Sequence, residues 1–211
     1  MTHDATIDRL IEAGGTLYSE EAGANLARDT PQELFHWLLT ALMLSARIGT
    51  STAIASSKAL RARGQHKIDA ILGDVTWDDL VKTLTEGGYT HYRENTATYI
   101  TEAAELVRDR YDDDLRRLRD EANDRDAILE ALQEVKGIGE LGAAIFAREA
   151  QIVWDPLHPT LGGPAEEAAR ELGLPHTARG LSEAAGDRER FVRLVAALTR
   201  ASIEGMPEGL G

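Results

Sequence analysis

Residues 135–154 read VKGIGELGAAIFAREAQIVW, a pair of glycines set between two helix-forming segments. Gly137 and Gly139 flank one apolar residue, and glycines allow a tight turn that side chains would obstruct. The helical pattern at 127–135 and from Glu140 onwards predicts two helices joined by this turn. We expect Ile138 to pack back between them and hold the corner together.

Such a turn leaves main-chain N–H groups and the positive end of the second helix facing outwards. Those groups suit a phosphate, and they recognise it without any preference for base sequence. The alternative interpretation is an ordinary helical corner that binds nothing. The turn by itself does not decide between the two.

The rest of the chain predicts an all-α protein, because helix-forming residues dominate and β-branched alternation is scarce. Thr30, Pro31 and Glu33 form the pattern of a capping box at a helix start, and Thr76 with Asp79 forms another. A chain of 211 residues can bury a core as one domain or as two small lobes. Further helices are expected at 51–63, from after Tyr92 to the acidic cluster near Asp112, at 164–171 and at 188–203, and a loop is expected at 154–163.

Four segments resemble the endonuclease III family of helix-hairpin-helix DNA glycosylases in order and spacing. They are LSAR at 44–47, GGYTHYRENTATYI at 87–100, VKGIGELGA at 135–143 and ELGLP at 171–175. The resemblance, to a divergent branch, implies a two-lobed helical fold that binds double-stranded DNA, damaged DNA included.

That resemblance implies one glycosylase-like unit over residues 1–211. Its expected lobes are a barrel-like lobe at 30–135, which includes the first hairpin helix, and a second lobe formed by 1–29 and 136–211.

The catalytic residues of the family are in doubt here. Bifunctional members carry a nucleophilic Lys in the second hairpin helix, and the matching position is Leu141, which has no lone pair to attack a sugar. A downstream Asp is expected to activate water or stabilise the cationic sugar. Counting from the hairpin gives Asp155, whereas counting from ELGL gives Gly162, in which case Asp155 only braces a loop. An unrecognised carboxylate such as Glu140 or Glu149 is a further alternative.

The resemblance also implies a set of DNA contacts. Arg47 stands where the family places a residue that fills the gap left by a flipped base, although a helix-end arginine is an equal interpretation. A weaker prediction is a base pocket at Tyr89, His91 and Tyr92, although such residues more often pack between lobes. The residues expected to contact the strand are Lys136, Gly137, Ile138, Gly139, Leu141 and Gly142, together with Arg47.

The amino-acid composition limits which cofactors, metals and partners the chain can bind. The chain has no cysteine, so it can form no disulfide and hold no cysteine-ligated zinc or iron–sulfur cluster, and we expect no cofactor and no metal. The net charge of −13 opposes DNA binding unless basic residues gather locally. No targeting or membrane segment is apparent, which predicts a soluble, cytoplasmic protein without a membrane partner. The oligomeric state is open.

Two functions follow from the sequence. The first is a DNA-binding protein of base-excision-repair type, which, if it is an enzyme, is a monofunctional glycosylase rather than a lyase. The second is a catalytically silent descendant that binds DNA structure or lesions, or that serves as an interaction scaffold.

Overall fold

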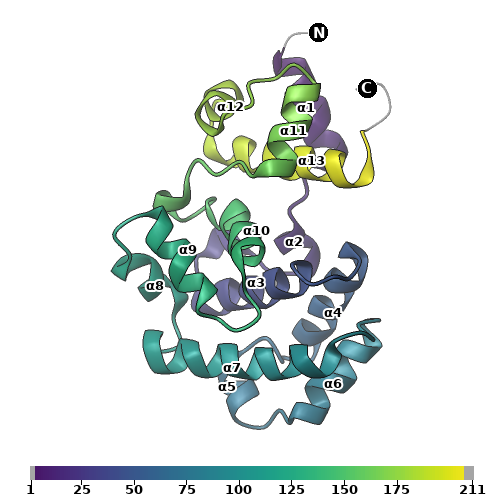
Figure 1. Ribbon diagram of the computed structural model, residues 1–211, viewed down its shortest axis with the longest axis vertical. Coiled ribbons are helices and arrows are strands. Elements are labelled where there is room, and N and C mark those ends of the chain that lie inside the picture. The colour runs from purple at the N-terminus through teal and green to yellow at the C-terminus, as the bar shows by residue number, and fades with distance from the viewer. Residues whose placement is uncertain (1–2, 207–211) are drawn as a thin grey trace. The chain divides into compact units, whose positions relative to one another are not determined.

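The computed structural model describes residues 3–206 and confirms the all-α class (Figure 1). Over that range the chain forms thirteen α-helices and two short 3-10 turns, and it has no β-strand. The helices gather into two compact units, one formed by Ser19–Phe146 and the other by Met1–Tyr18 with Ala147–Gly211. None of the helices in the described range is long and apolar enough to cross a membrane.

These units divide the chain at other points than the expected lobes. Residues 19–29 and 136–146 group with 30–135, so the hairpin turn and the first two turns of its second helix belong to the same unit as its first helix. The turn is therefore part of one packed body.

The unit Ser19–Phe146 is built around α3 (Pro31–Leu44), in which every residue from Glu33 to Met43 is buried. Helix α3 packs on α4 (Thr50–Ala62), which packs on α6 (Trp77–Glu86). The long α7 (Arg93–Tyr111) contacts α6 and α5 (Ile68–Leu72). The other elements are η1 (Leu26–Arg28), α8 (Leu115–Glu121), α9 (Arg125–Gln133) and α10 (Glu140–Ala150), with α2 (Tyr18–Ala22) at the boundary.

Helix α3 begins where the sequence predicts, but the predicted capping box is wrong. The Thr30 side chain makes no capping bond. The carboxylate of Glu33 instead accepts hydrogen bonds from the Asn25 main-chain N–H and from the Arg61 guanidinium, and Glu33 is 4% exposed. A buried carboxylate without charged or hydrogen-bonding partners costs more free energy than a helix N-terminus without a side-chain cap. The second capping box, between Thr76 and Asp79, is formed as predicted.

Polar side chains in the core of this unit form one connected network. His36 Nε2 lies 2.9 Å from Ser57 Oγ, which lies 2.6 Å from Thr40 Oγ1, and His36 Nδ1 lies 3.1 Å from Arg61 Nη1. Burial, with the nearby His66 and Arg61 charges, lowers the pKa of His36 to about 4. His36 is therefore a neutral core residue at pH 7, and its neighbour Trp37 is also fully buried.

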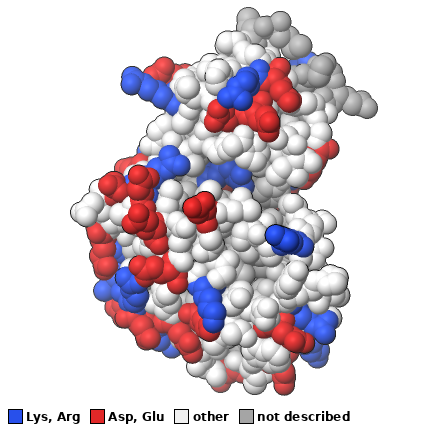
Figure 2. All heavy atoms as spheres, in the orientation of Figure 1, with Lys and Arg blue, Asp and Glu red and all other residues white. Residues whose placement is uncertain are grey.

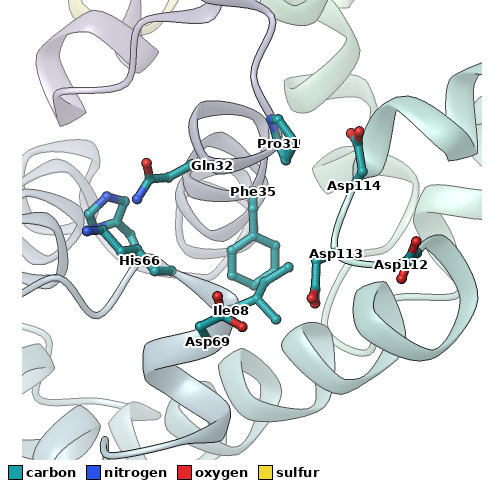
Figure 3. A pocket seen from close by; sticks show the side chains of 10 residues that line it. Pro31, Gln32, Phe35, His66, Ile68, Asp69, Asp112, Asp113 and Asp114 are labelled. Atoms are coloured by element: carbon teal, nitrogen blue, oxygen red, sulfur yellow. The ribbon is translucent and has the colours of Figure 1, made fainter.

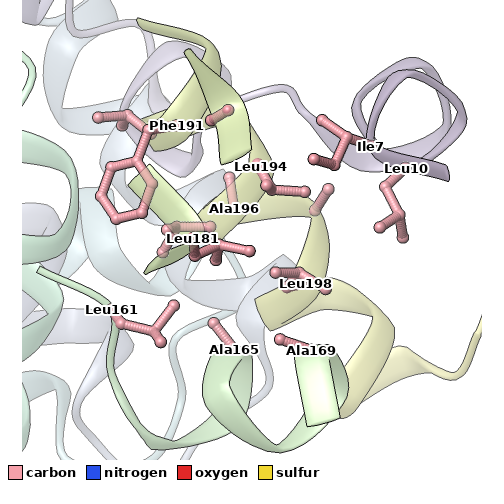
Figure 4. Packing of buried hydrophobic residues seen from close by; sticks show 14 of the residues in the cluster. Ile7, Leu10, Leu161, Ala165, Ala169, Leu181, Phe191, Leu194, Ala196 and Leu198 are labelled. Carbon is pink, nitrogen blue, oxygen red and sulfur yellow. The ribbon is translucent and has the colours of Figure 1, made fainter. Parts of the chain in front are cut away.

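The other unit packs α1 (His3–Gly14) and α11 (Gly163–Glu171) on α13 (Arg188–Glu204), with α12 (Ala178–Ala185) alongside. The hydrophobic cluster drawn in Figure 4 is aliphatic apart from Phe191, and Trp154 is also fully buried in this unit. The segment 154–163 is mostly loop, as predicted, apart from the short η2 (Asp155–Leu157). Gln151 fixes this loop because its amide donates to Thr160 O and accepts from Thr160 N–H.

Candidate nucleic-acid interface

The hairpin turn between α9 and α10 takes its shape from Gly137. This residue has φ +90°, a conformation that L side chains rarely adopt. A Cβ atom on Gly137 would also stand 2.6 Å from Cδ2 of Tyr99 on α7, so both the backbone and the neighbour require glycine. Gly139 differs, because a Cβ there would meet nothing within 4 Å. The two glycines are therefore not equivalent.

The turn leaves some of its amides without partners. Ile138 is buried, at 4% exposed, as expected for a residue that packs back between the helices, and its N–H donates to Val135 O at 2.9 Å, so this amide is not free for a ligand. In the described part of the chain, no acceptor takes the N–H of Gly137 or Gly139. The N–H groups in the first turn of α10 also lack intrahelical partners by geometry. Donors therefore remain on both sides of Ile138.

Helix α10 is held tightly against α3. The indole N–H of Trp37 donates to Phe146 O at 3.0 Å. A Cβ on Gly142 would come within 3.2 Å of Ser45 Oγ and within 3.3 Å of the Ile138 side chain. Gly142 is itself buried and lets the two helices approach, so it serves packing here. Leu141 points outwards instead, with 61% of its surface exposed.

A cavity of about 360 Å³ lies beside the turn, within the unit Ser19–Phe146. It brings together Arg47, Tyr89, Tyr92 and Gly137, four residues that the sequence singles out at distant positions. The complete lining is Leu42, Ser45, Ala46, Arg47, Tyr89, Tyr92, Asn95, Thr96, Tyr99 and Gly137.

Arg47 and Tyr92 are both accessible at this cavity, as are Asn95 and Gly137. Arg47 follows α3 in a turn, is exposed, and pairs with no carboxylate in the described range. Tyr92 is 58% exposed and takes a left-handed conformation, with φ +61°, at the start of α7. A cation and an aromatic ring are thus available to a ligand at one opening.

Tyr89 and His91 lie differently from Tyr92. Tyr89 is fully buried, its hydroxyl accepts a hydrogen bond from Thr96 Oγ1 at 3.0 Å, and burial raises its pKa. It contributes a wall rather than a free stacking surface. His91 is exposed but does not line the cavity; its ring lies 6.4 Å from that of Tyr92.

Sequence reasoning missed Asn95 and Tyr99. Both line the cavity and lie four residues apart in α7, which places them on one face of that helix, just after its N-cap residue Tyr92. That spacing was the signal that the sequence offered for these two residues.

The ammonium group of Lys136 lies over the Tyr99 ring, 5.7 Å from its centroid. It also lies 2.9 Å from the Glu102 carboxylate, and the hydrogen bond to this carboxylate raises the pKa of Lys136.

The surroundings of the turn are not uniformly basic. Glu140, the first residue of α10, is exposed, and Lys136 is already paired with Glu102. On the face of this unit drawn in Figure 2, acidic and basic side chains interleave, without a broad basic patch. Any anion bound here would rely on main-chain donors and on Arg47.

Of the candidate catalytic residues, Asp155, Gly162 and Glu149 belong to the other unit. Asp155 begins η2 in the other unit, its side chain is 83% exposed, and it accepts from Arg188 at 2.6 Å. Gly162 is the N-cap of α11, with φ +91°. Glu149 is 2% exposed and accepts from the Tyr18 main-chain N–H, which gives it a structural role. The residues in the described range contain no cluster of three His, Asp or Glu side chains able to hold a metal ion.

No protein-family model matches the chain, and no curated protein matches it. Among solved structures, the chain is similar to a trapped endonuclease III–DNA covalent intermediate in an estranged-adenine complex. The TM-score is 0.47 and the sequence identity is 17%, over 78% of this chain and 71% of the other.

Proposed function

We propose that this chain is a DNA-binding protein of base-excision-repair type, which holds one strand at the turn 137–139. The observation that carries the proposal is the cavity shared by Arg47, Tyr92 and Gly137, beside two main-chain donors that have no acceptor in the described range. The four segments that resemble endonuclease III support the same partner.

The first step is strand binding. The N–H groups of Gly137 and Gly139 and the start of α10 offer donors and a positive dipole end to one phosphate. Such contacts fix the position of a strand without reading its bases. They also suit an acidic protein, because a few local donors replace a broad basic surface.

The second step is recognition of an unstacked nucleotide. The volume of about 360 Å³ is in the range of small-ligand sites, and the Tyr92 ring offers a stacking face. Arg47 can stack on an orphaned base or donate hydrogen bonds to it. A duplex weakened by a lesion yields such a nucleotide at lower cost than an intact duplex does.

A second candidate function is lesion binding without catalysis. Two observations favour it: Leu141 replaces the family's nucleophile, and the Asp155 carboxylate already pairs with Arg188. If the protein is an enzyme, Asp155 would position water for a monofunctional glycosylase, and a Schiff-base lyase is not expected. An interaction scaffold that binds no DNA is the remaining alternative.

The test is fluorescence anisotropy with a labelled duplex, either intact or containing one abasic site, over a series of salt concentrations. We expect tighter binding to the abasic duplex, weakening steeply as salt rises. Arg47→Gln should weaken binding to the abasic duplex about tenfold. Arg125→Gln is the matched control, because Arg125 is also exposed and unpaired in the described range. Absence of binding even in dilute buffer would leave only the scaffold.

A further inference from the structure

Arg148, in the last turn of α10, differs from the paired arginines of this chain. Five arginines have a raised pKa, and a hydrogen bond to a carboxylate is the main cause in each. Around the cavity of about 430 Å³ drawn in Figure 3, for example, the carboxylates of Asp69 and Asp113 both bind Arg108. Burial instead lowers the pKa of Arg148.

The Arg148 guanidinium has no anionic partner. It makes no hydrogen bond and no ion pair in the described part of the chain, although the residue keeps part of its surface exposed. The carboxylate of the adjacent Glu149 accepts from the Tyr18 main-chain N–H at 2.9 Å, and its charge acts on Arg148 only at longer range. A desolvated cation without a partner is costly and uncommon in folded proteins, and it is one of the marks of an ion-binding position.

The side chain of Arg148 runs beside the start of α11. A Cβ atom on Gly162, the N-cap residue of α11, would stand 3.9 Å from Arg148 Cδ. Gly162 and Gly163 are both exposed, and a Cβ on Gly163 would meet nothing within 4 Å. The N–H groups of these two glycines have no acceptor among the described residues. Main-chain donors therefore lie next to the arginine.

Hydrogen bonds and packing hold this loop in place. The Gln151 amide donates to Arg148 O and to Thr160 O, both at 2.8 Å, and accepts from Thr160 N–H at 2.7 Å. Leu161 belongs to the aliphatic cluster of the unit (Figure 4). All of these residues lie in one compact unit, so the arginine and the two glycines keep their relative positions.

We propose that Arg148 and the start of α11 bind a phosphate group, either free phosphate or the phosphate of a nucleotide. The guanidinium would donate to two phosphate oxygens, and the N–H groups of Gly162 and Gly163 to another, at the positive end of a nine-residue helix. A carboxylate has only two oxygens, which the guanidinium alone can occupy, so it would use fewer of these donors. The position lies in another unit than the turn 137–139, so it does not depend on the proposed function.

Two carboxylates oppose an anion at this position. Glu149 is buried next to Arg148 in the chain, and Glu166 lies in the first turn of α11, where it pairs with Arg170 at 2.6 Å. Their negative charges weaken the attraction for phosphate, so we expect binding in the millimolar range.

The experiment is thermal unfolding of the full chain in rising concentrations of inorganic phosphate, thymidine 5′-phosphate, thymidine or acetate, with chloride keeping the ionic strength constant. A ligand that binds only the folded state raises the midpoint of unfolding. We expect a saturable rise with both phosphates and none with thymidine or acetate. Tighter binding of thymidine 5′-phosphate would identify a nucleotide as the source of the phosphate group, and equal or weaker binding would identify free phosphate.

Arg148→Met should weaken phosphate binding about tenfold or more. It should not destabilise the unliganded protein, because it removes an uncompensated charge and keeps most of the side-chain volume. Arg179→Met is the matched control in the same unit, because Arg179 is exposed and paired with Glu183, and it should respond to phosphate as the wild type does. Arg47→Gln should also respond fully, which separates this position from the hairpin turn.

Gly163→Asp provides a second test that leaves Arg148 in place. Its carboxylate would occupy the same donors at the helix start, so the response to phosphate should be lost, whereas Gly163→Ala should keep it; the open space at Gly163 admits both side chains. The proposal is overturned if phosphate raises the midpoint no more than acetate does, or if Arg148→Met or Gly163→Asp responds as fully as the wild type.

Discussion

Gly137 lies so close to Tyr99 that a Cβ atom at residue 137 would stand 2.6 Å from Cδ2 of the aromatic ring. The ring belongs to α7 and the glycine to the hairpin turn, so this contact fixes the turn against a helix far away in sequence. Lys136 lies over the same ring, 5.7 Å from its centroid. The shape of the turn therefore depends on tertiary packing as well as on its own residues.

Gly137→Ala should therefore destabilise the unit and displace the turn. A left-handed conformation costs a residue with a Cβ about 1–3 kcal/mol, and the clash with Tyr99 adds to that cost. Gly64→Ala is the control, because Gly64 has φ +71° but open space around its Cβ position. Urea unfolding should show a larger loss for Gly137→Ala than for Gly64→Ala. Gly139→Ala should change stability little, and equal losses at 64 and 137 would contradict a role for Tyr99.

The ion pair of Lys136 with Glu102 should limit DNA affinity. The ammonium that is expected to meet a phosphate now lies 2.9 Å from a carboxylate. Glu102→Gln should release it, tighten binding and steepen the slope of log affinity against log salt by about one, the effect of one more phosphate contact. Glu105→Gln, on the same helix and exposed, is the control. Weaker binding by Glu102→Gln than by Glu105→Gln would show that the pair only positions the turn.

The sequence was sufficient for most helices and for the hairpin, because their signals are local: the glycines at 137 and 139, the capping box at Thr76 and the apolar spacing. The capping box predicted for Thr30 and Glu33 does not form, because the Glu33 carboxylate binds Arg61, a partner 28 residues away. Helices α1 and α12 also went unassigned, although Ile7 and Leu10 have helical spacing. The site was predicted in part, because Arg47 and Tyr92 converge on Gly137 only through packing that no local pattern encodes.

Acid should destabilise this protein through its buried histidines. His36 is fully buried, and its pKa is lowered from 6.5 to about 4 in the folded state. Between those values the unfolded chain binds protons that the folded chain does not, so the free energy of unfolding falls as pH falls from 6.5 towards 4. The contribution of His36 is fully present above pH 6.5 and amounts to about 3 kcal/mol at most.

The measurement is urea unfolding at several pH values between 4 and 7.5. His36→Gln should lower stability at neutral pH but flatten the dependence on pH, because the titrating group is gone. His91→Gln, which removes an exposed histidine, should leave the slope of the free energy of unfolding against pH as it is in the wild type. If His36→Gln also leaves that slope unchanged, the pH dependence of stability comes from other groups.

Asp155 is the residue that a monofunctional glycosylase would use if the catalytic position is counted from the hairpin. Its carboxylate is exposed and pairs with Arg188 at 2.6 Å, and an exposed pair of this kind contributes about 0–1 kcal/mol. If the protein is a silent binding module, neither the wild type nor Asp155→Asn should release a damaged base, and the DNA affinity of the variant should stay within about twofold of the wild type. Arg188→Gln breaks the same pair but keeps the carboxylate, so the two variants should behave alike if only the pair matters. Loss of base release in Asp155→Asn alone, with the protein still folded, would instead make Asp155 catalytic and remove the argument for a silent binding module.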